Sequence, residues 1–494
     1  MWLIIILGLI FLFSRLINLT LLPVFADEAI YIHWAQVIWH DAANRFIPLS
    51  DGKPPLFMWL MVPFLKTFSD PLFAGRLLSA LSGLATLVGV YFLSEKLFSK
   101  KIAILASILV ILQPFLLFYD RLAIVDSMLT AFGIWSFYVA YLLFEKPTLG
   151  KGIILGTLWG GAILTKPTGI YFPFLTPPLI LLHLTKKWQQ KIKQLILPSL
   201  LAVGYGLGFV NVLRLSPAFH MLGSRTTDYF RTKQDFLTQG SEYIPDTAGV
   251  LFHWLVSYFS WSLVVWLILG VWLVWRTKEK KVGVILLWII IPFVVQVFIG
   301  KIIYPRYLLI TAPFLIIFLA WIGVEAWKVR VKQLLIRIGL GVLAAITLSF
   351  WLYFDFWLWE TPAKAPLDKI EKEQYLQEWS AGFGLKEVAD YLKALPKDKE
   401  IMVATEGYFG TLPNGLQIYL DQVEKIDIRG VGQPIHYLPD EVLGALKENK
   451  RAYLVVNNTR LKIVDQSALK LIAEYPKPEG PKGQESLLFF EVLP

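Results

Sequence analysis

Residues 22–36 read LPVFADEAIYIHWAQ and follow the first long apolar run of the chain, residues 2–22. Two adjacent carboxylates, Asp27 and Glu28, stand just after that run. A run of this length can cross a hydrocarbon core of ~30 Å. It has no basic n-region and no small-residue cleavage site, which predicts an uncleaved membrane span. The sequence therefore places two charges where the chain leaves lipid.

The composition is that of a membrane protein. Hydrophobic residues make up 56% of the chain and charged residues 17%, against about a quarter charged in ordinary soluble domains. Aromatic residues gather near the ends of apolar runs, as in interfacial belts. The chain has no cysteine, which excludes disulfides and thiolate chemistry. These features predict an α-helical polytopic membrane protein embedded in the lipid bilayer.

The apolar runs predict about eleven transmembrane helices. Their expected bounds are 2–22, 72–94, 102–119, 123–144, 151–165, 168–184, 194–213, 251–275, 282–300, 304–324 and 334–356. Alternate loops differ in charge: one set, from "EKLFSKK" to "EAWKVRVKQLLIR", holds 17 Lys+Arg and 4 acidic residues. Basic loops are typically cytoplasmic, so we expect a multi-pass cell-membrane protein with a cytoplasmic N-terminus and an extracytoplasmic C-terminus.

The charge balance changes near residue 356. From Phe356 onward there are 17 basic and 21 acidic residues, against 30 and 16 before it. The net charge of +10 fits cationic loops on one membrane side rather than nucleic-acid binding. In the tail, "LKEVADYLKAL" predicts an amphipathic helix, and "EIMVATEG", "RAYLVVNN" and "SLLFFEVLP" predict strands. We therefore predict a membrane domain, residues 1–356, and a small extracytoplasmic α/β domain, residues 357–494.

Polar residues that lipid would expel gather on the predicted outer face. They come from six separate segments: Asp27, Glu28, Lys53, Arg76, Asp120, Arg121, Asp126, Lys166, Arg306 and Tyr307. A cation at a span end often only extends to the headgroups, and an acid in an outer loop is often only solvated. The convergence of so many segments favours a functional site.

Carboxylates beside several cations at a lipid interface suit transfer from a lipid phosphate. The cations hold a phosphate that leaves as an anion, and Arg and Lys are both suited to this. A carboxylate takes the proton of an incoming hydroxyl. Phosphate is already a good leaving group, so the general acid of a glycosidase is not needed.

The ordered motifs resemble the GT-C superfamily of polytopic glycosyltransferases, in particular family 39 and its bacterial relatives, the protein O-mannosyltransferases and the lipid A aminoarabinose transferase. The resemblance covers the predicted membrane domain in order and spacing. It rests on the pair Asp27–Glu28, "KPPLFMWL" from Lys53, Arg76 at the second span, "RLAIVDSMLTAF" with Arg121 and Asp126, Lys166, and the pair Arg306–Tyr307.

The resemblance implies a GT-C fold and an inverting transfer of a mannose-like or other monosaccharide from a polyprenyl-phosphate donor. The acceptor is a hydroxyl of a glycolipid, a cell-envelope glycan or a protein. Asp27 is the expected base, with Glu28 and Asp126 as further catalytic carboxylates. The expected phosphate and donor ligands are Lys53, Arg76, Arg121, Lys166, Arg306 and Tyr307.

Several alternatives stay open at this stage. A divalent cation, Mg²⁺ or Mn²⁺, held by Asp27 and Asp126 is possible chemistry, whereas His33 is expected to serve packing rather than metal binding. The polar segment 215–250 is either a cover over the site or a passive loop. The rival functions are a transporter or flippase of a lipid-linked sugar, which would show matched broken helices in two halves, and a ligase that uses a diphosphate donor.

Overall fold

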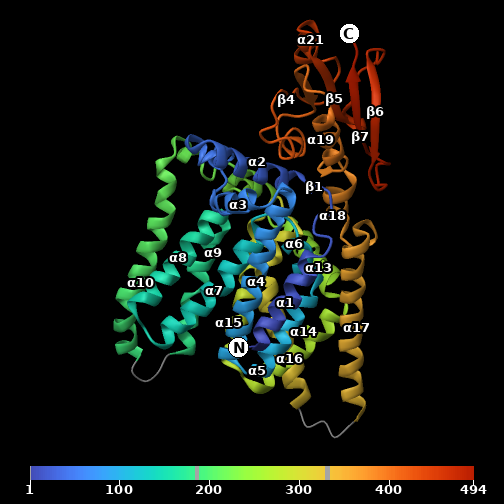
Figure 1. Ribbon diagram of the computed structural model, residues 1–494. Coiled ribbons are helices and arrows are strands. Elements are labelled where there is room, and N and C mark those ends of the chain that lie inside the picture. The colour runs from blue at the N-terminus through green and yellow to red at the C-terminus, as the bar shows by residue number, and fades with distance from the viewer. Residues whose placement is uncertain (1, 184–187, 329–333) are drawn as a thin grey trace. The chain divides into compact units, whose positions relative to one another are not determined.

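The computed structural model describes residues 2–183, 188–328 and 334–494 (Figure 1). The chain forms two units that do not follow its order. We call Met1–Ile17, Arg45–Trp59 and Leu77–Glu360 the helical unit. We call Asn18–Asn44, Leu60–Arg76 and Thr361–Pro494 the mixed unit. The contacts thus divide the chain differently from the predicted domains 1–356 and 357–494, because two early segments pack with the tail.

Helices make up the helical unit. They are α1 (Trp2–Leu16), α5 (Lys100–Leu112), α6 (Pro114–Asp120), α7 (Asp126–Glu145), α8 (Leu149–Thr165), α9 (Tyr171–Leu175), α10 (Trp188–Asn211), α11 (Thr226–Tyr229), α12 (Lys233–Gln239), α13 (Tyr243–Phe259), α14 (Ser262–Thr277), α15 (Lys280–Ile299), α16 (Ala312–Lys328) and α17 (Leu334–Glu360). Two helices, α3 (Leu56–Thr67) and α4 (Pro71–Leu97), contain residues of both units.

The described residues include six helices long and apolar enough to cross a membrane, or up to eight if each of two bent pairs counts as one span. The pair α5 and α6 bends by 60°, and the pair α13 and α14 by 102°. The predicted span 251–275 is therefore two helices, and residues 168–182 of the predicted span 168–184 form short helical turns. Apolarity marked these segments correctly as membrane-compatible but could not show where a helix bends.

Helices α8 and α10 pack closely because α8 carries glycine at every fourth position. A Cβ on Gly152 would lie 2.2 Å from the Pro198 carbonyl oxygen, and one on Gly156 would lie 2.3 Å from that of Ala202. Small residues four apart let two membrane helices approach backbone to backbone. Close packing thus replaces the hydrophobic effect, which lipid does not supply between helices.

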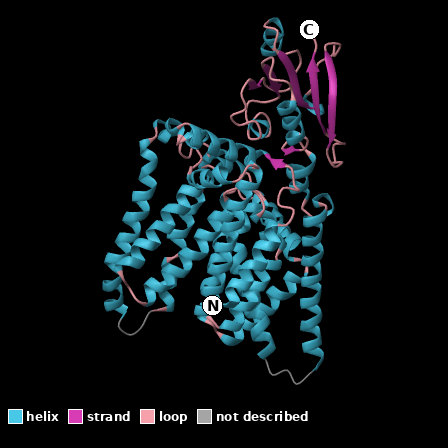
Figure 2. Ribbon diagram, viewed as in Figure 1, coloured by secondary structure: helices cyan, strands magenta, loops and turns pink. Residues whose placement is uncertain are grey.

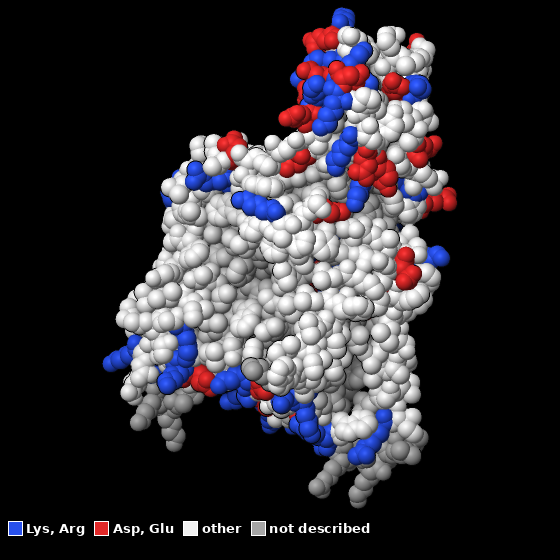
Figure 3. All heavy atoms as spheres, in the orientation of Figure 1, with Lys and Arg blue, Asp and Glu red and all other residues white. Residues whose placement is uncertain are grey.

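Basic side chains gather at one end of the helical unit, near the start of α5 (Figure 3). Lys96 pairs with Glu145 at 2.8 Å, and Lys191 Nζ donates to the Glu145 carbonyl at 2.7 Å. These residues belong to three of the loops that the sequence predicted on one membrane side. Their proximity agrees with that grouping.

The mixed unit contains all the named strands (Figure 2). They are β1 (Val24–Phe25), β2 (Ala381–Gly382), β3 (Ile401–Thr405), β4 (Ile426–Gly430), β5 (Arg451–Asn457), β6 (Leu469–Pro476) and β7 (Ser486–Val492). The sheet order is β4-β3-β5-β7-β6, with β4, β3 and β5 parallel and β7 and β6 antiparallel. The helices of this unit include α2 (Ala26–His40), α18 (Lys369–Lys372), α19 (Leu385–Ala394), α20 (Asn414–Gln417) and α21 (Asp440–Lys447).

The predicted α/β tail is confirmed. Its helix α19 and strands β3, β5 and β7 match the four quoted motifs, and β5 is almost wholly buried, as its apolar run requires. The sequence did not reveal β4 and β6, the two edge strands. Both are half exposed and rich in charge, so their patterns lack a continuous apolar run.

Helix α2 belongs to the mixed unit by direct contacts with the tail. Gln36 Nε2 donates to the Ile418 carbonyl at 2.9 Å, and His40 Nε2 lies 2.8 Å from Asp421 Oδ2. The ring centroids of Trp34 and Phe409 are 5.5 Å apart. The helix that begins with the acidic pair is therefore held by residues almost 400 positions later in the chain.

Candidate active site

The acidic pair opens helix α2. Asp27 is partly exposed, whereas Glu28 is fully buried. Glu28 Oε2 accepts a hydrogen bond from the Phe25 backbone N–H at 3.0 Å, which satisfies one of the donors that a helix N-terminus leaves unpaired. Carboxylates are also favoured at this end of a helix by its dipole. Local chemistry therefore fixes Glu28 inward and leaves Asp27 accessible.

Arg76 completes this group. Its Nε and Nη2 donate to the two Glu28 oxygens at 2.8 Å each. Nη1 donates to the Leu19 and Leu22 carbonyls at 2.9 Å, and Nη2 also donates to the Pro23 carbonyl at 3.0 Å. All five N–H donors are used and the side chain has no exposed surface. These contacts indicate that Arg76 holds the acidic loop, and its predicted role in binding a phosphate stays a prediction.

The tail fixes the backbone on the other side of Asp27. Strand β1 pairs with β2, Val24 opposite Gly382 and Phe25 opposite Ala381. The Ala26 N–H donates to the Ser380 carbonyl at 3.1 Å, and the Phe25 and Tyr375 rings lie 4.4 Å apart. The residue before Asp27 is thus tied to the polypeptide that follows α17.

A second group of predicted residues lies in the helical unit. Asp126 begins α7 and is buried, and Lys166 follows the last residue of α8. Lys166 Nζ lies 2.7 Å from Asp126 Oδ1 and 4.3 Å from the centroid of the Tyr307 ring. The Lys166 side chain keeps 20% of its surface exposed. The structure thus brings together an acid, a cation and an aromatic ring that the sequence separates by 40 and 141 positions.

The remaining predicted cations lie in the same unit. The Arg306 guanidinium is 5.9 Å from the Tyr307 ring and 5.1 Å from the Tyr304 ring. Tyr307 therefore has both Lys166 and Arg306 close to its ring. Arg121 is buried directly after α6.

Lys53, a predicted phosphate ligand, pairs with an acid two residues earlier in the chain. Its Nζ lies 3.3 Å from Asp51 Oδ2, and Asp51 Oδ1 is 3.1 Å from Arg225 Nη1. Arg225 belongs to segment 215–250, which folds into short helices and pairs Phe230 with Gly300. The segment is ordered against the loop that carries Lys53, and its role as a cover stays a prediction.

Sequence reasoning missed an internal charge cluster of the helical unit. Arg15 of α1 is fully buried, with Nε 3.5 Å from Asp120 Oδ2. Its Nη2 donates to the Val110 carbonyl at 3.0 Å. That carbonyl would normally bond the N–H of residue 114, which is proline and has none. Arg15 thus supplies the donor that Pro114 lacks, and an arginine in an apolar run was the available signal.

Two further residues, Asp355 and Gly83, lie close to this charge cluster. Asp355 of α17 is buried within electrostatic reach of Arg15 and Arg121. A Cβ on Gly83 would lie 2.5 Å from the Asp120 carboxylate, so that position requires glycine. The cluster closes the bend between α5 and α6 from inside the bundle, as membrane-depth irregular backbone requires.

The described residues contain no group of three or more His, Cys, Asp or Glu placed to hold a metal ion. Burial lowers the pKa of His33, which agrees with the expected packing role. The predicted divalent cation on Asp27 and Asp126 stays a prediction.

Comparisons with known proteins agree with the membrane motifs. The profile of the dolichyl-phosphate-mannose-protein mannosyltransferase family matches residues 52–208. A search of curated proteins found no match. Among solved structures, ArnT from Cupriavidus metallidurans bound to undecaprenyl phosphate is similar, with a TM-score of 0.61, 16% identity, and coverage of 99% of this chain and 97% of that one.

A second similar structure is the oligosaccharyltransferase AglB from Archaeoglobus fulgidus, in complex with an inhibitory peptide and a dolichol-phosphate. Its TM-score is 0.51 at 11% identity, covering 98% of this chain and 73% of that one. At such identities the likeness concerns the fold. The chain is thus an α-helical polytopic protein with the GT-C fold and a C-terminal sheet. Its resemblance to the dolichyl-phosphate-mannose-protein mannosyltransferase family is confirmed over residues 52–208.

Proposed function

We propose that the protein is an inverting glycosyltransferase that moves a monosaccharide from a polyprenyl-phosphate donor to a hydroxyl acceptor. The observation that carries the proposal is the pairing of Lys166 with Asp126 beside Tyr307, a partly exposed cation in an otherwise buried setting. The family match over residues 52–208 and the fold shared with lipid-phosphate-bound ArnT support it.

The residues divide the reaction between them. Asp27, accessible at the first turn of α2, takes the proton of the acceptor hydroxyl. The acceptor oxygen forms a bond to the anomeric carbon as the bond from that carbon to the phosphate oxygen breaks. The electron pair leaves with the lipid phosphate, whose new negative charge Lys166 and Arg306 stabilise.

Glu28 and Arg76 act as positioning residues in this scheme. Their bidentate pair and the carbonyls around Arg76 keep the loop before α2 in one conformation. A base held within a fraction of an ångström of its productive position is worth several powers of ten in rate. We further propose that the basic loops are cytoplasmic, and that the acidic pair and the tail face the extracytoplasmic side, where a mannose-like sugar is transferred.

The test uses purified protein in detergent with polyprenyl-phosphate mannose and a mixture of envelope glycolipid, glycan and peptide acceptors, and measures release of polyprenyl phosphate. Asp27→Asn is expected to lower release at least ~10²-fold, the scale of a lost general base. Asp41→Asn, at the other end of α2, is the matched control and should keep full activity.

Two results would contradict the proposal. Equal release by wild type and Asp27→Asn would remove Asp27 as the base and direct attention to Asp126. Absence of release with every donor, together with movement of lipid-linked sugar across vesicles, would favour the transporter reading.

A further inference from the structure

The carboxyl ends of three parallel strands meet at one edge of the tail sheet. Strands β4 and β5 flank β3, so the chain crosses from one side of β3 to the other between them. In open α/β sheets ligands bind outside the carboxyl ends at such a reversal of strand order. The polypeptide after β3, with the sequence EGYFG from Glu406 to Gly410, lies at this edge.

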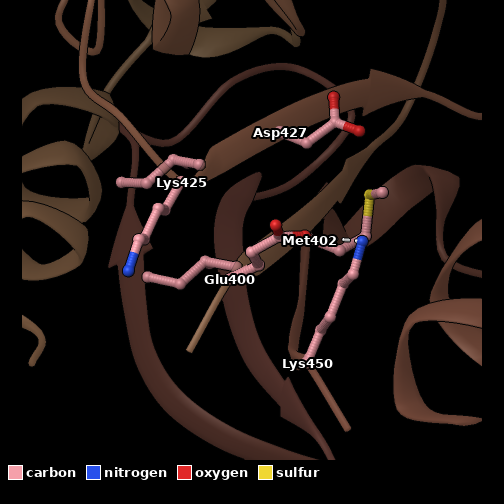
Figure 4. Close-up of a pocket in the computed structure, with 7 residues that line it drawn as sticks. Glu400, Met402, Lys425, Asp427 and Lys450 are labelled. Carbon is pink, nitrogen blue, oxygen red and sulfur yellow. Dashed lines mark ion pairs between the residues drawn. The ribbon is translucent and has the colours of Figure 1, made fainter. Parts of the chain in front are cut away.

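The opposite edge carries a shallow pocket lined by the amino ends of the same strands, with Met402, Lys425 and Asp427 in its wall (Figure 4). Its cation Lys450 lies 2.7 Å from Glu400 and 2.9 Å from Glu448. Lys450 is therefore already paired with two carboxylates, and the pocket lies at the edge that such sheets do not use for ligands. The carboxyl edge of the sheet is therefore the better candidate for ligand binding.

Four side chains form what we call the aromatic shelf: Trp379, Tyr408, Phe409 and Arg460. The exposed fractions of the three rings are 37%, 76% and 44%. Exposed rings in a soluble region add little to folding, because they stay in contact with water. Exposed rings at the edge of the sheet where ligands bind indicate an interaction site.

The ring of Tyr408 is held in place although it is exposed. Gly407 has φ +70° and its N–H donates to the Gly432 carbonyl at 2.8 Å. A Cβ on Gly432 would lie 3.0 Å from the Tyr408 hydroxyl oxygen, and one on Gly430 would lie 2.9 Å from the Tyr408 Cα. Two glycines thus let the loop and the Tyr408 side chain lie directly on the backbone at the end of β4.

Arg460 is fixed over Trp379 by a buried carboxylate. Its guanidinium carbon lies 4.3 Å from the centroid of the Trp379 ring, and Nη1 is 3.1 Å from Glu406 Oε1. Glu406 is 2% exposed and accepts from the Asn457 backbone N–H at 2.8 Å and from Nδ2 at 2.7 Å. The shelf therefore combines rigid aromatic faces with an oriented donor group.

The shelf is tied to the start of α2. Trp379 precedes Ser380, whose carbonyl accepts from the N–H of Ala26, the neighbour of Asp27. Phe409 stacks near Trp34, seven residues after Asp27 and so about 10 Å along the helix. Both connections lie within the mixed unit, and they place the shelf within a few sugar lengths of the proposed base.

We propose that the aromatic shelf binds the acceptor, and that this acceptor is a saccharide. A pyranose ring has an apolar face of C–H groups that packs on an aromatic ring, while its hydroxyls accept hydrogen bonds from a group such as Arg460. Rigid rings with a few convergent polar groups are what a small-ligand site requires. The inference rests on the proposed function, because only a transferase has an acceptor. Binding of a saccharide to the shelf can nevertheless be measured without any transfer reaction.

The experiment measures binding of oligosaccharides of four to six residues to the full-length protein in detergent by calorimetry, with one series each of α-mannose, β-glucose and N-acetylhexosamine. At least one series should bind, and Tyr408→Ala should weaken its binding at least tenfold. Tyr408→Phe, which keeps the ring, should bind within twofold of wild type. Asp41→Asn, at the other end of α2, should bind like wild type, because Asp41 is part of neither the shelf nor the proposed site.

Kinetics provide the second measurement. With a binding saccharide as acceptor, Tyr408→Ala should raise the acceptor KM and leave the donor KM and kcat near wild type. No binding by any series, equal binding by Tyr408→Ala, or binding of a Ser/Thr peptide alone overturns the proposal. Binding without any transfer by wild type supports the shelf and contradicts the proposed function, so the two failures are distinguishable.

Discussion

The pairs Glu28–Arg76 and Asp126–Lys166 looked alike in the sequence, each an acid and a cation near a predicted span end. In the structure Arg76 has no exposed surface and uses all five donors on a carboxylate and three carbonyls. Lys166 keeps a fifth of its side chain exposed beside Tyr307. The first pair builds a loop, whereas the second can still meet a ligand. The burial of the cation and the number of its N–H donors already in use, not the residue type, separate a structural pair from a candidate binding pair.

The largest expected effect is a loss of stability, and it tests the pair Glu28–Arg76. Arg76→Met leaves Glu28 buried without its cation and three carbonyls without donors, so we expect a loss of about 3–5 kcal/mol in unfolding free energy. Thermal unfolding in detergent measures it. Arg225→Met removes an exposed ion pair and should change stability by no more than about 1 kcal/mol. If Arg76→Met instead keeps wild-type stability and raises the donor KM, the comparison fails and Arg76 binds phosphate after all.

The next largest effect is a loss of activity, and it tests the pair Asp126–Lys166. Lys166→Met removes a charge-assisted hydrogen bond to the leaving phosphate, about 1.5–3 kcal/mol, and should lower donor kcat/KM about 10–10²-fold. The measurement is steady-state release of polyprenyl phosphate. The double variant Asp126→Asn/Lys166→Met removes the unpaired acid, so it should regain stability but not activity. Recovery of activity in the double variant would reduce Lys166 to a structural partner of Asp126.

Lys477, a buried cation of the tail, sharpens the comparison, because lysine can lose its proton and arginine cannot. Lys477, in the tail, lies 3.9 Å from Glu485, and burial lowers its pKa to about 8. The unfolded chain, with an ordinary lysine pKa, binds more protons above pH 8, so folding stability attributable to Lys477 rises with pH there. Between pH 8 and 9 wild type should gain about 1 kcal/mol relative to Lys477→Met in denaturant titrations. An equal pH dependence in both proteins would place the Lys477 pKa elsewhere.

The sequence predicted the features that depend on local pattern. Apolar length marked the helices, branched runs marked β3, β5 and β7, and charge grouped the loops at one end of the helical unit. It also named Asp126, Lys166 and Tyr307 among ten candidate polar residues, but it did not predict that these three are neighbours. Features that depend on distant partners were out of reach. The N–H groups of Arg76 donate to carbonyls over 50 positions away. Arg15 bonds the carbonyl left without a donor by a proline about 100 positions later. Helix α2 packs on residues near 420.

The two-residue pairing of β1 with β2 has a consequence for engineering. An exchange of the tail alone would cut the chain at the end of α17. Here residues 361–494 share their backbone hydrogen bonds with residues 24–26 and their side-chain contacts with the rest of α2. A functional chimera must therefore carry residues 18–44 and 60–76 from the same parent as its tail. The exchangeable module of this chain is discontinuous in sequence.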